Sequence, residues 1–192
     1  MVSRVEDVVV TLRERLWTYD DYRQLPDDGQ RYEVIYGRLY ATSVPRTFHQ
    51  TVSRRLQDLL YELERQGKGY VFDAPVEVLM PGATPVQPDL IYLNREQREM
   101  IAEKSIEGAP HLVVEILSPS TASRDRTLKL NVYAKAGVPN YWILDPAART
   151  LEVFELTDSG YRVAAALGGD ETFEAHSVEG LIVKLPELFA PL

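Results

Sequence analysis

Apolar residues recur at intervals of three and four along residues 46–66, a stretch that contains no Pro or Gly. The recurring positions are Val52, Leu56, Leu59, Leu60 and Leu63. Such spacing gathers the apolar side chains on one face and leaves charged residues on the other, so it predicts a long amphipathic helix. A second helix is predicted over residues 123–136, because Gly137 and then Pro139 follow it as stop signals.

Short runs rich in β-branched and aromatic residues lie outside these helices. Residues 70–73, 76–80 and 89–93 are separated by Pro and Gly, and they predict three strands that pair with one another. Residues 111–117 form an almost wholly apolar run, which is typical of a buried strand at the centre of a sheet. Residues 141–144 predict another buried strand after the second helix.

The ends of the chain add further elements. The pattern predicts a short helix over 18–25, a hairpin of 31–35 and 38–42, a polar helical stretch over 95–103, strands over 150–156, 161–166 and 181–185, and a last turn at 186–189. We therefore expect an α/β fold in which a mixed sheet is flanked by helices, in the order helix, three strands, helix, strand, with an amino-terminal hairpin and extra carboxy-terminal strands. No repeat or linker divides the chain, so one domain is expected over residues 1–192, with its core at about 46–146.

Composition narrows the class of protein. The 192 residues are 45% hydrophobic and 26% charged, as in a folded soluble domain, and no apolar run approaches the roughly 20 residues of a membrane helix. The absence of Cys excludes disulfides, thiolate metal sites and a cysteine nucleophile, and it suits a reducing cytoplasm. Residues 1–16 show no export signal, which also fits a cytoplasmic protein. The net charge of −8 repels nucleic acid, so such a partner needs a local basic patch, for example within residues 121–140.

Glu115 interrupts the apolar run of residues 111–117. In an extended strand it shares a face with Val113 and Leu117, and the opposite face is apolar as well. A carboxylate in this position is costly to desolvate unless a cation, a metal or hydrogen-bond donors compensate it, or unless its pKa rises and it keeps its proton. A structural salt bridge or an exposed strand end is the alternative explanation of Glu115.

Asp89 is a second acid among apolar neighbours. It begins the predicted strand 89–93, directly after Pro88, and alternation puts it on the face of Ile91 and Leu93. Two carboxylates on neighbouring strands repel each other unless a divalent cation bridges them, and oxygen ligands favour Mg²⁺ or Mn²⁺. A turn acid or a strand cap is the alternative for Asp89.

Lys129 is predicted to lie level with Glu115. From Glu115 to the end of its strand is about 7 Å, and from the start of the second helix to Lys129 is about 9 Å, so a helix that folds back brings the two together. Lys129 also shares a helix face with Tyr133, which points its amine toward the sheet and toward a carboxylate. The alternatives are a surface pair with Asp125, four residues earlier, or an amine that reaches water.

Together these motifs resemble a known family. The motifs are Pro88-Asp89, Glu115 in Val-Val-Glu-Ile-Leu-Ser-Pro-Ser-Thr, Lys129 with Tyr133, the string from Gly137 to Pro146, Tyr32-Glu33-Val34-Ile35-Tyr36-Gly37 and His49-Gln50. Over about residues 18–156 the chain resembles the Uma-two (Uma2) family of "putative restriction endonucleases", which is placed in the PD-(D/E)XK nuclease superfamily.

The resemblance implies a restriction endonuclease-like fold and hydrolysis of nucleic acid with Mg²⁺ or Mn²⁺, with DNA as the expected substrate and a homodimer as the expected assembly. It implies that Asp89, Glu115 and the carbonyl of Ile116 bind the metal. The superfamily Lys two residues after the Glu is absent, because position 117 is Leu. Lys129 is the candidate replacement, which would orient the attacking water or stabilise developing charge.

Three further residues are possible members of the site. Glu33 would be an additional acid, although a charge at a sheet edge is the more usual role of a hairpin residue. His49 would touch substrate or metal, although a histidine at a helix start more often lies on the surface. Tyr133 follows Lys129 by one helical turn and belongs to the same motif.

Other functions stay open at this point. Leu117 favours a degenerate nuclease fold that serves as a nucleic-acid-binding or regulatory module, in which the acids and the lysine form a buried ion network without turnover. A hydrolase that uses two carboxylates as acid and base, as glycosidases do, is a second alternative, and the inward lysine argues against it. Serine chemistry at Ser118 lacks the G-x-S-x-G motif, and the three His residues are too scattered to predict a zinc site.

Overall fold

The computed structural model describes residues 16–42 and 46–191, and its largest element is a six-stranded sheet. In spatial order its strands are β11 (Gly160–Gly168), β10 (Thr150–Thr157), β9 (Asn140–Asp145), β8 (Leu112–Ile116), β6 (Leu90–Asn94) and β3 (Gly69–Asp73). Only β8 and β9 pair in parallel, and the other neighbours are antiparallel. The sheet is therefore mixed, and the predicted buried strands at 111–117 and 141–144 are confirmed as its two central strands.

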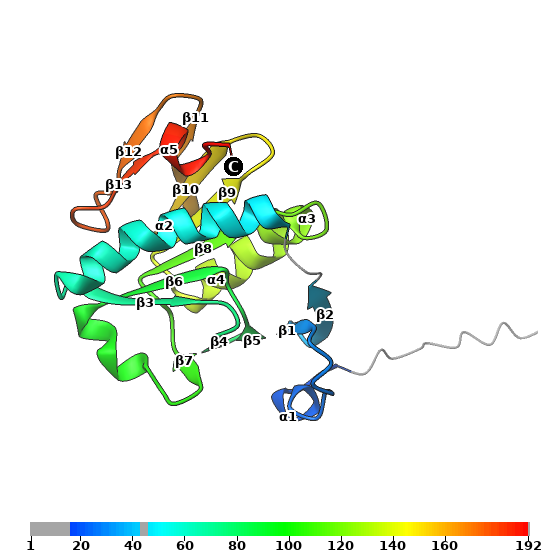
Figure 1. The fold of residues 1–192 in the computed structure, drawn as a ribbon. Helices are drawn as coiled ribbons and strands as arrows, with labels where there is room; N and C mark the ends of the chain where they lie inside the picture. The colour runs from blue at the N-terminus through cyan, green and yellow to red at the C-terminus, as the bar shows by residue number, and fades with distance from the viewer. Residues whose placement is uncertain (1–15, 43–45, 192) are drawn as a thin grey trace, which may run out of the picture.

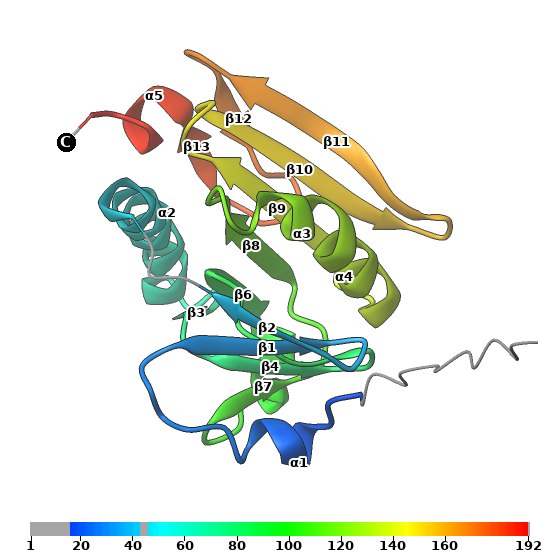
Figure 2. The ribbon, with the colours of Figure 1, turned by 90° about the vertical axis from the view of Figure 1, so that its right-hand side faces the viewer.

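Helices cover both faces of this sheet (Figure 1). One face packs against α2 (Thr47–Arg65), α5 (Leu185–Leu188) and the hairpin of β12 (Thr172–Glu174) and β13 (Ile182–Lys184). The other face packs against the segment from α3 (Ala122–Arg124) to α4 (Leu130–Ala136), as Figure 2 shows. This arrangement follows from β8, whose alternate residues enter the two separate hydrophobic clusters.

The two predicted long helices are present, and one of them is irregular. The helix predicted over residues 46–66 is confirmed as α2. The helix predicted over 123–136 forms in three continuous pieces, because a π-helical turn, η2 (Asp125–Lys129), lies between α3 and α4. A π turn holds one extra residue in the helix, and it occurs frequently at functional sites.

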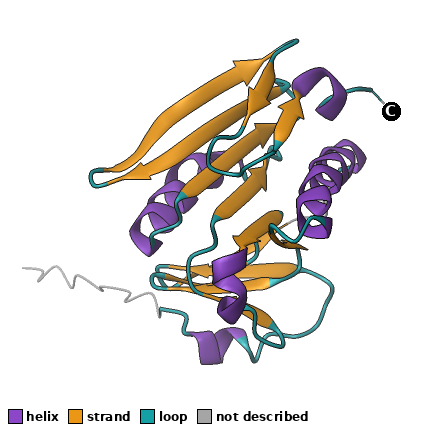
Figure 3. Cartoon of the chain, turned by 90° about the vertical axis from the view of Figure 1, so that its left-hand side faces the viewer, coloured by secondary structure: helices purple, strands orange, loops and turns teal. Residues whose placement is uncertain are grey.

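A second sheet lies against the α4 side of the first (Figure 3). Its strands, in spatial order, are β2 (Arg38–Thr42), β1 (Arg31–Ile35), β5 (Ala83–Val86), β4 (Glu77–Met80) and β7 (Ser105–Glu107). The predicted pairing of residues 76–80 with the neighbouring strands was wrong, because β4 pairs with β5 and β7 instead. Gly82, with a φ of 83°, turns the chain directly into β5, a strand that Pro85 hid from prediction.

The remaining elements are short. They are α1 (Tyr19–Tyr22), within the predicted 18–25, and the 3₁₀ helix η1 (Arg95–Met100), within the predicted 95–103. The predicted last turn at 186–189 is the single helical turn of α5, and β12 was not predicted. Among the helices that the structure describes, none has both the length and the apolar character needed to cross a lipid bilayer.

Candidate active site

Glu115 lies where β8 meets the α3–α4 segment. Its strand neighbours Val113 and Leu117 belong to the hydrophobic cluster on that side, as alternation predicts. Only 3% of Glu115 is exposed. The exposed strand end considered above is therefore wrong, and the carboxylate needs compensation inside the protein.

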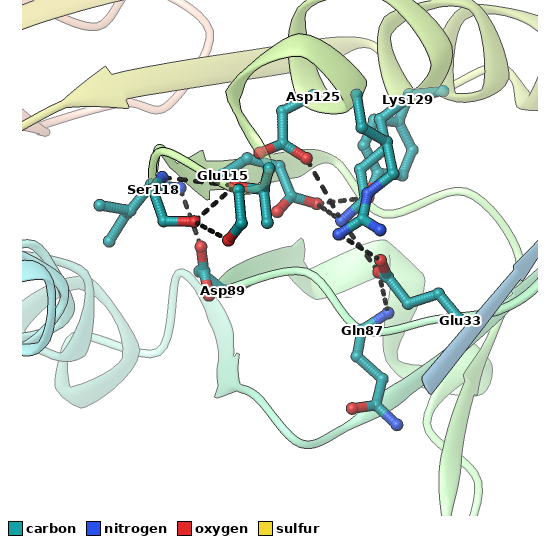
Figure 4. Close-up of polar contacts among 12 residues, drawn as sticks. Glu33, Gln87, Asp89, Glu115, Ser118, Asp125 and Lys129 are labelled. Atoms are coloured by element: carbon teal, nitrogen blue, oxygen red, sulfur yellow. Dashed lines mark hydrogen bonds and ion pairs between the residues drawn. The ribbon is translucent and has the colours of Figure 1, made fainter. Parts of the chain in front are cut away.

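Lys129 provides that compensation. Its Nζ lies 2.8 Å from Glu115 Oε1 and also 2.8 Å from Glu33 Oε1, and its side chain is 3% exposed (Figure 4). Tyr133, on the next turn of the same helical segment, donates its hydroxyl to Glu115 Oε1 at 2.6 Å. The prediction that the amine points toward the sheet and meets a carboxylate is confirmed, and the water-exposed alternative for Lys129 is wrong.

Glu33 belongs to this cluster and is not an edge charge. It lies on β1, which pairs with both β2 and β5, so the hairpin is extended into a sheet and Glu33 becomes 1% exposed. The backbone N–H of Gln87 donates to Glu33 Oε1 at 3.0 Å, beside the Lys129 amine. The long-range pairing of β1 with β5 is what brings this acid to Glu115.

Asp125 is a member that the sequence analysis did not propose as a site residue. It is 1% exposed, and its Oδ1 lies 3.7 Å from Lys129 Nζ. The spacing of four residues was noted, but it suggested a pair on the helix surface. We call Glu33, Glu115, Asp125, Lys129 and Tyr133 the inner group.

Asp89 directly precedes β6, which begins at Leu90, one residue later than predicted. Its Oδ2 accepts the backbone N–H of Ile116 at 2.9 Å, which fixes the carboxylate beside the residue that follows Glu115. His49 Nε2 lies 3.3 Å from Oδ2, and Arg31 Nη1 lies 3.5 Å from Oδ1. His49 is thus buried against a site acid, and it is not the surface residue that its place at a helix start suggested. We call Arg31, His49 and Asp89 the outer group.

The inner group holds more acid than base, and its pKa values reflect this. Burial raises the pKa of Glu115 to about 8, and the neighbouring acids Asp125, Asp89 and Glu33 together with burial outweigh the opposing effect of Lys129. Burial also raises the pKa of Asp125. Burial acts on Glu33 in the same direction, but Lys129 and the Gln87 N–H reverse its effect and hold the pKa of Glu33 below its ordinary value.

Two cations lie beside these carboxylates. Burial alone would lower the pKa of Lys129, but the surrounding carboxylates, Glu115 first, raise it above its ordinary value, so Lys129 carries a full charge at neutral pH. Arg124 contributes a second positive charge, with its Nη2 3.7 Å from Glu33 Oε2. One lysine and one arginine therefore face three carboxylates.

The donor set suits a hard divalent cation. Asp89 accepts the backbone N–H of Ile116, the residue after Glu115, so both acids belong to the same end of β8. Burial, and after it the nearby acids Asp125, Asp89 and Glu33, raise the pKa of Glu115. Among the described residues no three His, Cys, Asp or Glu side chains form a metal-binding cluster.

Position 117, where the superfamily resemblance leads one to expect a lysine, is occupied by Leu. Leu117 follows the end of β8 and packs in the hydrophobic cluster with 7% exposure, so it offers no polar group to the site. Lys129 instead reaches Glu115 from the π-helical turn η2. The structure therefore brings Asp89, Glu115, Lys129, Glu33, His49 and Tyr133 together, and it adds Asp125, Arg31 and Arg124.

Comparisons with known proteins concern the family and the fold of the chain. Residues 19–186 match the family Uma2, which is described as "Putative restriction endonuclease". A crystal structure described as "a putative nuclease belonging to DUF820", from Anabaena variabilis ATCC 29413, matches the fold with a TM-score of 0.76, over 90% of this chain and 97% of that chain. Its sequence is 18% identical to this one, so this likeness concerns the fold. No curated protein matches the chain.

Proposed function

The chain belongs to the Uma2 family, and from this premise we propose that it is a metal-dependent nuclease that hydrolyses phosphodiester bonds in nucleic acid, with DNA as the expected substrate. One observation carries the proposal. A single buried amine, that of Lys129, contacts Glu115 at 2.8 Å, while Asp89 is fixed to the next residue along the strand. Two acids can hold a divalent ion that activates water, and a nearby amine can offset negative charge on a phosphate, so this set supports metal-assisted phosphodiester hydrolysis.

In this proposal Asp89 and Glu115 hold the divalent ion, together with the carbonyl of Ile116. Mg²⁺ or Mn²⁺, when bound, lowers the pKa of a coordinated water and offsets negative charge on the phosphate. The Ile116 N–H donates to Asp89 and the Tyr133 hydroxyl donates to Glu115, so both carboxylates that would hold the ion are already fixed by hydrogen bonds.

Lys129 has an electrostatic role in the proposal. Because its pKa is raised, the amine holds its proton at neutral pH and does not act as a base. It stabilises negative charge that develops at the phosphate and it orients the attacking water. Glu33 and Asp125 hold the amine beside Glu115, so they are positioning residues in this mechanism.

A catalytically degenerate binding module is the second candidate, and burial favours it. Glu33, Glu115 and Lys129 are each at most 3% exposed, and a network this enclosed also serves as a structural ion cluster. This candidate predicts that the chain binds nucleic acid and does not cut it, with or without a divalent ion.

A cleavage assay separates the two candidates. Supercoiled plasmid, single-stranded DNA and RNA are incubated with the protein in Mg²⁺, in Mn²⁺ and in EDTA. We expect metal-dependent cleavage that Glu115→Ala and Asp89→Ala abolish, and that the exposed control Glu174→Ala retains. Absence of cleavage of every substrate in both metals, by protein that binds nucleic acid, supports the degenerate module.

Metal binding has its own measurement. Thermal unfolding of the wild type should shift to higher temperature in Mg²⁺ or Mn²⁺, because the ion binds the folded state only. Asp89→Ala and Glu115→Ala should lose that shift, whereas Glu174→Ala should keep it. A wild type whose unfolding temperature is unchanged by both ions would contradict the metal-dependent mechanism.

Sedimentation of the same samples tests the homodimer expected from the family resemblance.

A further inference from the structure

Arg31 was not among the residues expected in the site, yet it stands beside Asp89. It is the first residue of β1, and its Nη2 donates to the carbonyl of Gln87 at 2.7 Å. Its Nη1 lies 3.5 Å from Asp89 Oδ1, which is an ion pair but longer than a normal hydrogen bond. Arg31 is therefore fixed at one end of its guanidinium and only loosely paired at the other.

The exposure of the basic side chains shows which of them borders solvent. The side chain of Lys129 is 3% exposed, those of His49 and Arg124 are 9% and 12% exposed, and that of Arg31 is 22% exposed. Arg31 is thus the most accessible of these four groups, and it borders solvent directly next to Asp89. A substrate that approaches the acids meets Arg31 before it meets the buried amine.

Arg31 also keeps unused hydrogen-bonding capacity. In the part of the chain that the structure describes, its Nε is buried and has no hydrogen-bond partner. A buried donor without a partner costs free energy, and such groups call for a physical explanation. A guanidinium offers five N–H groups in a planar fork, which matches the oxygens of a phosphate group.

We propose that Arg31 binds a non-bridging oxygen of a substrate phosphate at the open side of the site, next to Asp89. The inference rests on the proposed function and names the residue that receives the polyanion. The net charge of −8 repels nucleic acid, and Arg31 would offset this repulsion locally, because it places a positive charge at the solvent-exposed side of Asp89. A residue that serves only as counter-ion to Asp89 would not be expected to affect nucleic-acid binding.

The test measures binding without turnover. A fluorescein-labelled DNA duplex is titrated in EDTA at several salt concentrations, with the wild type, Arg31→Gln, Arg31→Lys and Arg162→Gln. Arg162 is the matched control, an arginine that pairs with one carboxylate on the distant β10–β11 hairpin. Arg31→Gln retains a donor for the Gln87 carbonyl and removes the charge and the fork.

We expect Arg31→Gln to weaken binding about tenfold and to reduce the slope of log K against log salt by about one. Arg31→Lys should retain the slope and weaken binding by a smaller factor, because it keeps the charge without the fork. Arg162→Gln should match the wild type. If Arg31→Gln binds DNA with the wild-type affinity and salt slope, the inference is wrong.

The outcomes also distinguish this inference from the proposed function. If the protein never cuts nucleic acid but Arg31→Gln lowers both affinity and salt slope, Arg31 is a phosphate-binding residue of a module without turnover. If cleavage occurs and the Arg31 variants bind as the wild type does, the nuclease stands and the inference is overturned. Should Arg31→Gln fail to fold, wild-type affinity in Arg31→Lys overturns it equally. A wild type that binds no nucleic acid overturns both.

Discussion

The inner and outer groups of the site differ in how many positively charged or hydrogen-bonding partners each acid has. In the inner group the buried amine of Lys129 is shared by Glu33 and Glu115, with Asp125 close by. In the outer group a single acid, Asp89, has an N–H donor, an arginine and a histidine. The inner group thus has three carboxylates around one lysine amine, whereas the outer group has three partners around one carboxylate.

This difference shows in the pKa values. Burial would raise the pKa of Asp89, but His49, Arg31 and the Ile116 N–H hold it below its ordinary value. Burial raises the pKa of Glu115 to about 8, because the acids Asp125, Asp89 and Glu33 act in the same direction as burial while Lys129 opposes it. Burial therefore does not fix the state of a carboxylate. The direction of the shift depends on the particular groups that face each carboxylate, since Glu33, in the same group as Glu115, has a lowered pKa through Lys129 and the Gln87 N–H.

The largest expected effect is that of removing the shared cation. Lys129→Met leaves Glu33, Glu115 and Asp125 buried without the amine, and it should lower the free energy of unfolding by about 3–5 kcal/mol. Urea unfolding at pH 7 measures this. Lys135→Met is the control, because Lys135 is exposed on α4 and its amine lies over the ring of Tyr36, 5.3 Å from the ring centroid, an exposed contact worth about 1 kcal/mol. Equal losses in the two variants would mean that the inner group does not depend on Lys129.

A smaller effect should appear in the pH dependence of stability. Glu115 ionises near 4.5 when unfolded and at about 8 when folded, so between these values the folded state binds more protons. The free energy of unfolding therefore falls as pH rises through this window, and Glu115→Gln should make the fall shallower. Asp125, whose pKa is also raised, leaves a remaining slope of the same sign.

Thermal or urea unfolding in EDTA from pH 4.5 to 8 checks this expectation. The exposed Glu174→Gln serves as the control and should follow the wild type. The pKa values of Glu33 and Asp89 are lowered in the folded state, so these two acids make the free energy of unfolding rise with pH. Their contribution is lost as pH falls below the ordinary carboxyl range. Parallel profiles for the wild type and Glu115→Gln between pH 4.5 and 8 would contradict the assignment.

The smallest effect on stability is expected in the outer group. Arg31→Gln should lower the free energy of unfolding by no more than about 1 kcal/mol, because the guanidinium is partly exposed and its ion pair is long. Urea unfolding of this variant beside Lys129→Met tests the contrast directly. A loss as large as that of Lys129→Met would show that the two groups form one tightly coupled network.

Local patterns in the sequence were enough for the regular part of the fold. The three- and four-residue spacing of α2 and the apolar runs of β8 and β9 predicted these elements, because each buries a continuous face or a whole strand. The second sheet was harder, because β5 is short and contains Pro85, and β7 has three residues. Such strands exist through pairing with distant segments, which a local pattern does not show.

The same distinction holds for the site. Alternation along β8 and the helix face of Lys129 predicted how Glu115 and the amine meet, since both follow from local geometry. Glu33 and His49 seemed more typical of exposed positions, because their burial depends on β5 and on Asp89, which lie far away in sequence. The π-helical turn η2 had no sequence signal at all, so the burial of Asp125 beside Lys129 was missed.

The placement of the lysine on a helix has a consequence for how the site is assembled. A lysine at position 117 would be held in register by the sheet itself, whereas Lys129 reaches Glu115 only while the α3–α4 segment is docked on that sheet. The charge pattern of the site thus depends on tertiary docking, and a local opening of this segment would dismantle the lysine–glutamate contact while the six strands stayed paired. The Lys129–Glu115 contact therefore exists only while the interface between the α3–α4 segment and the six-stranded sheet is intact.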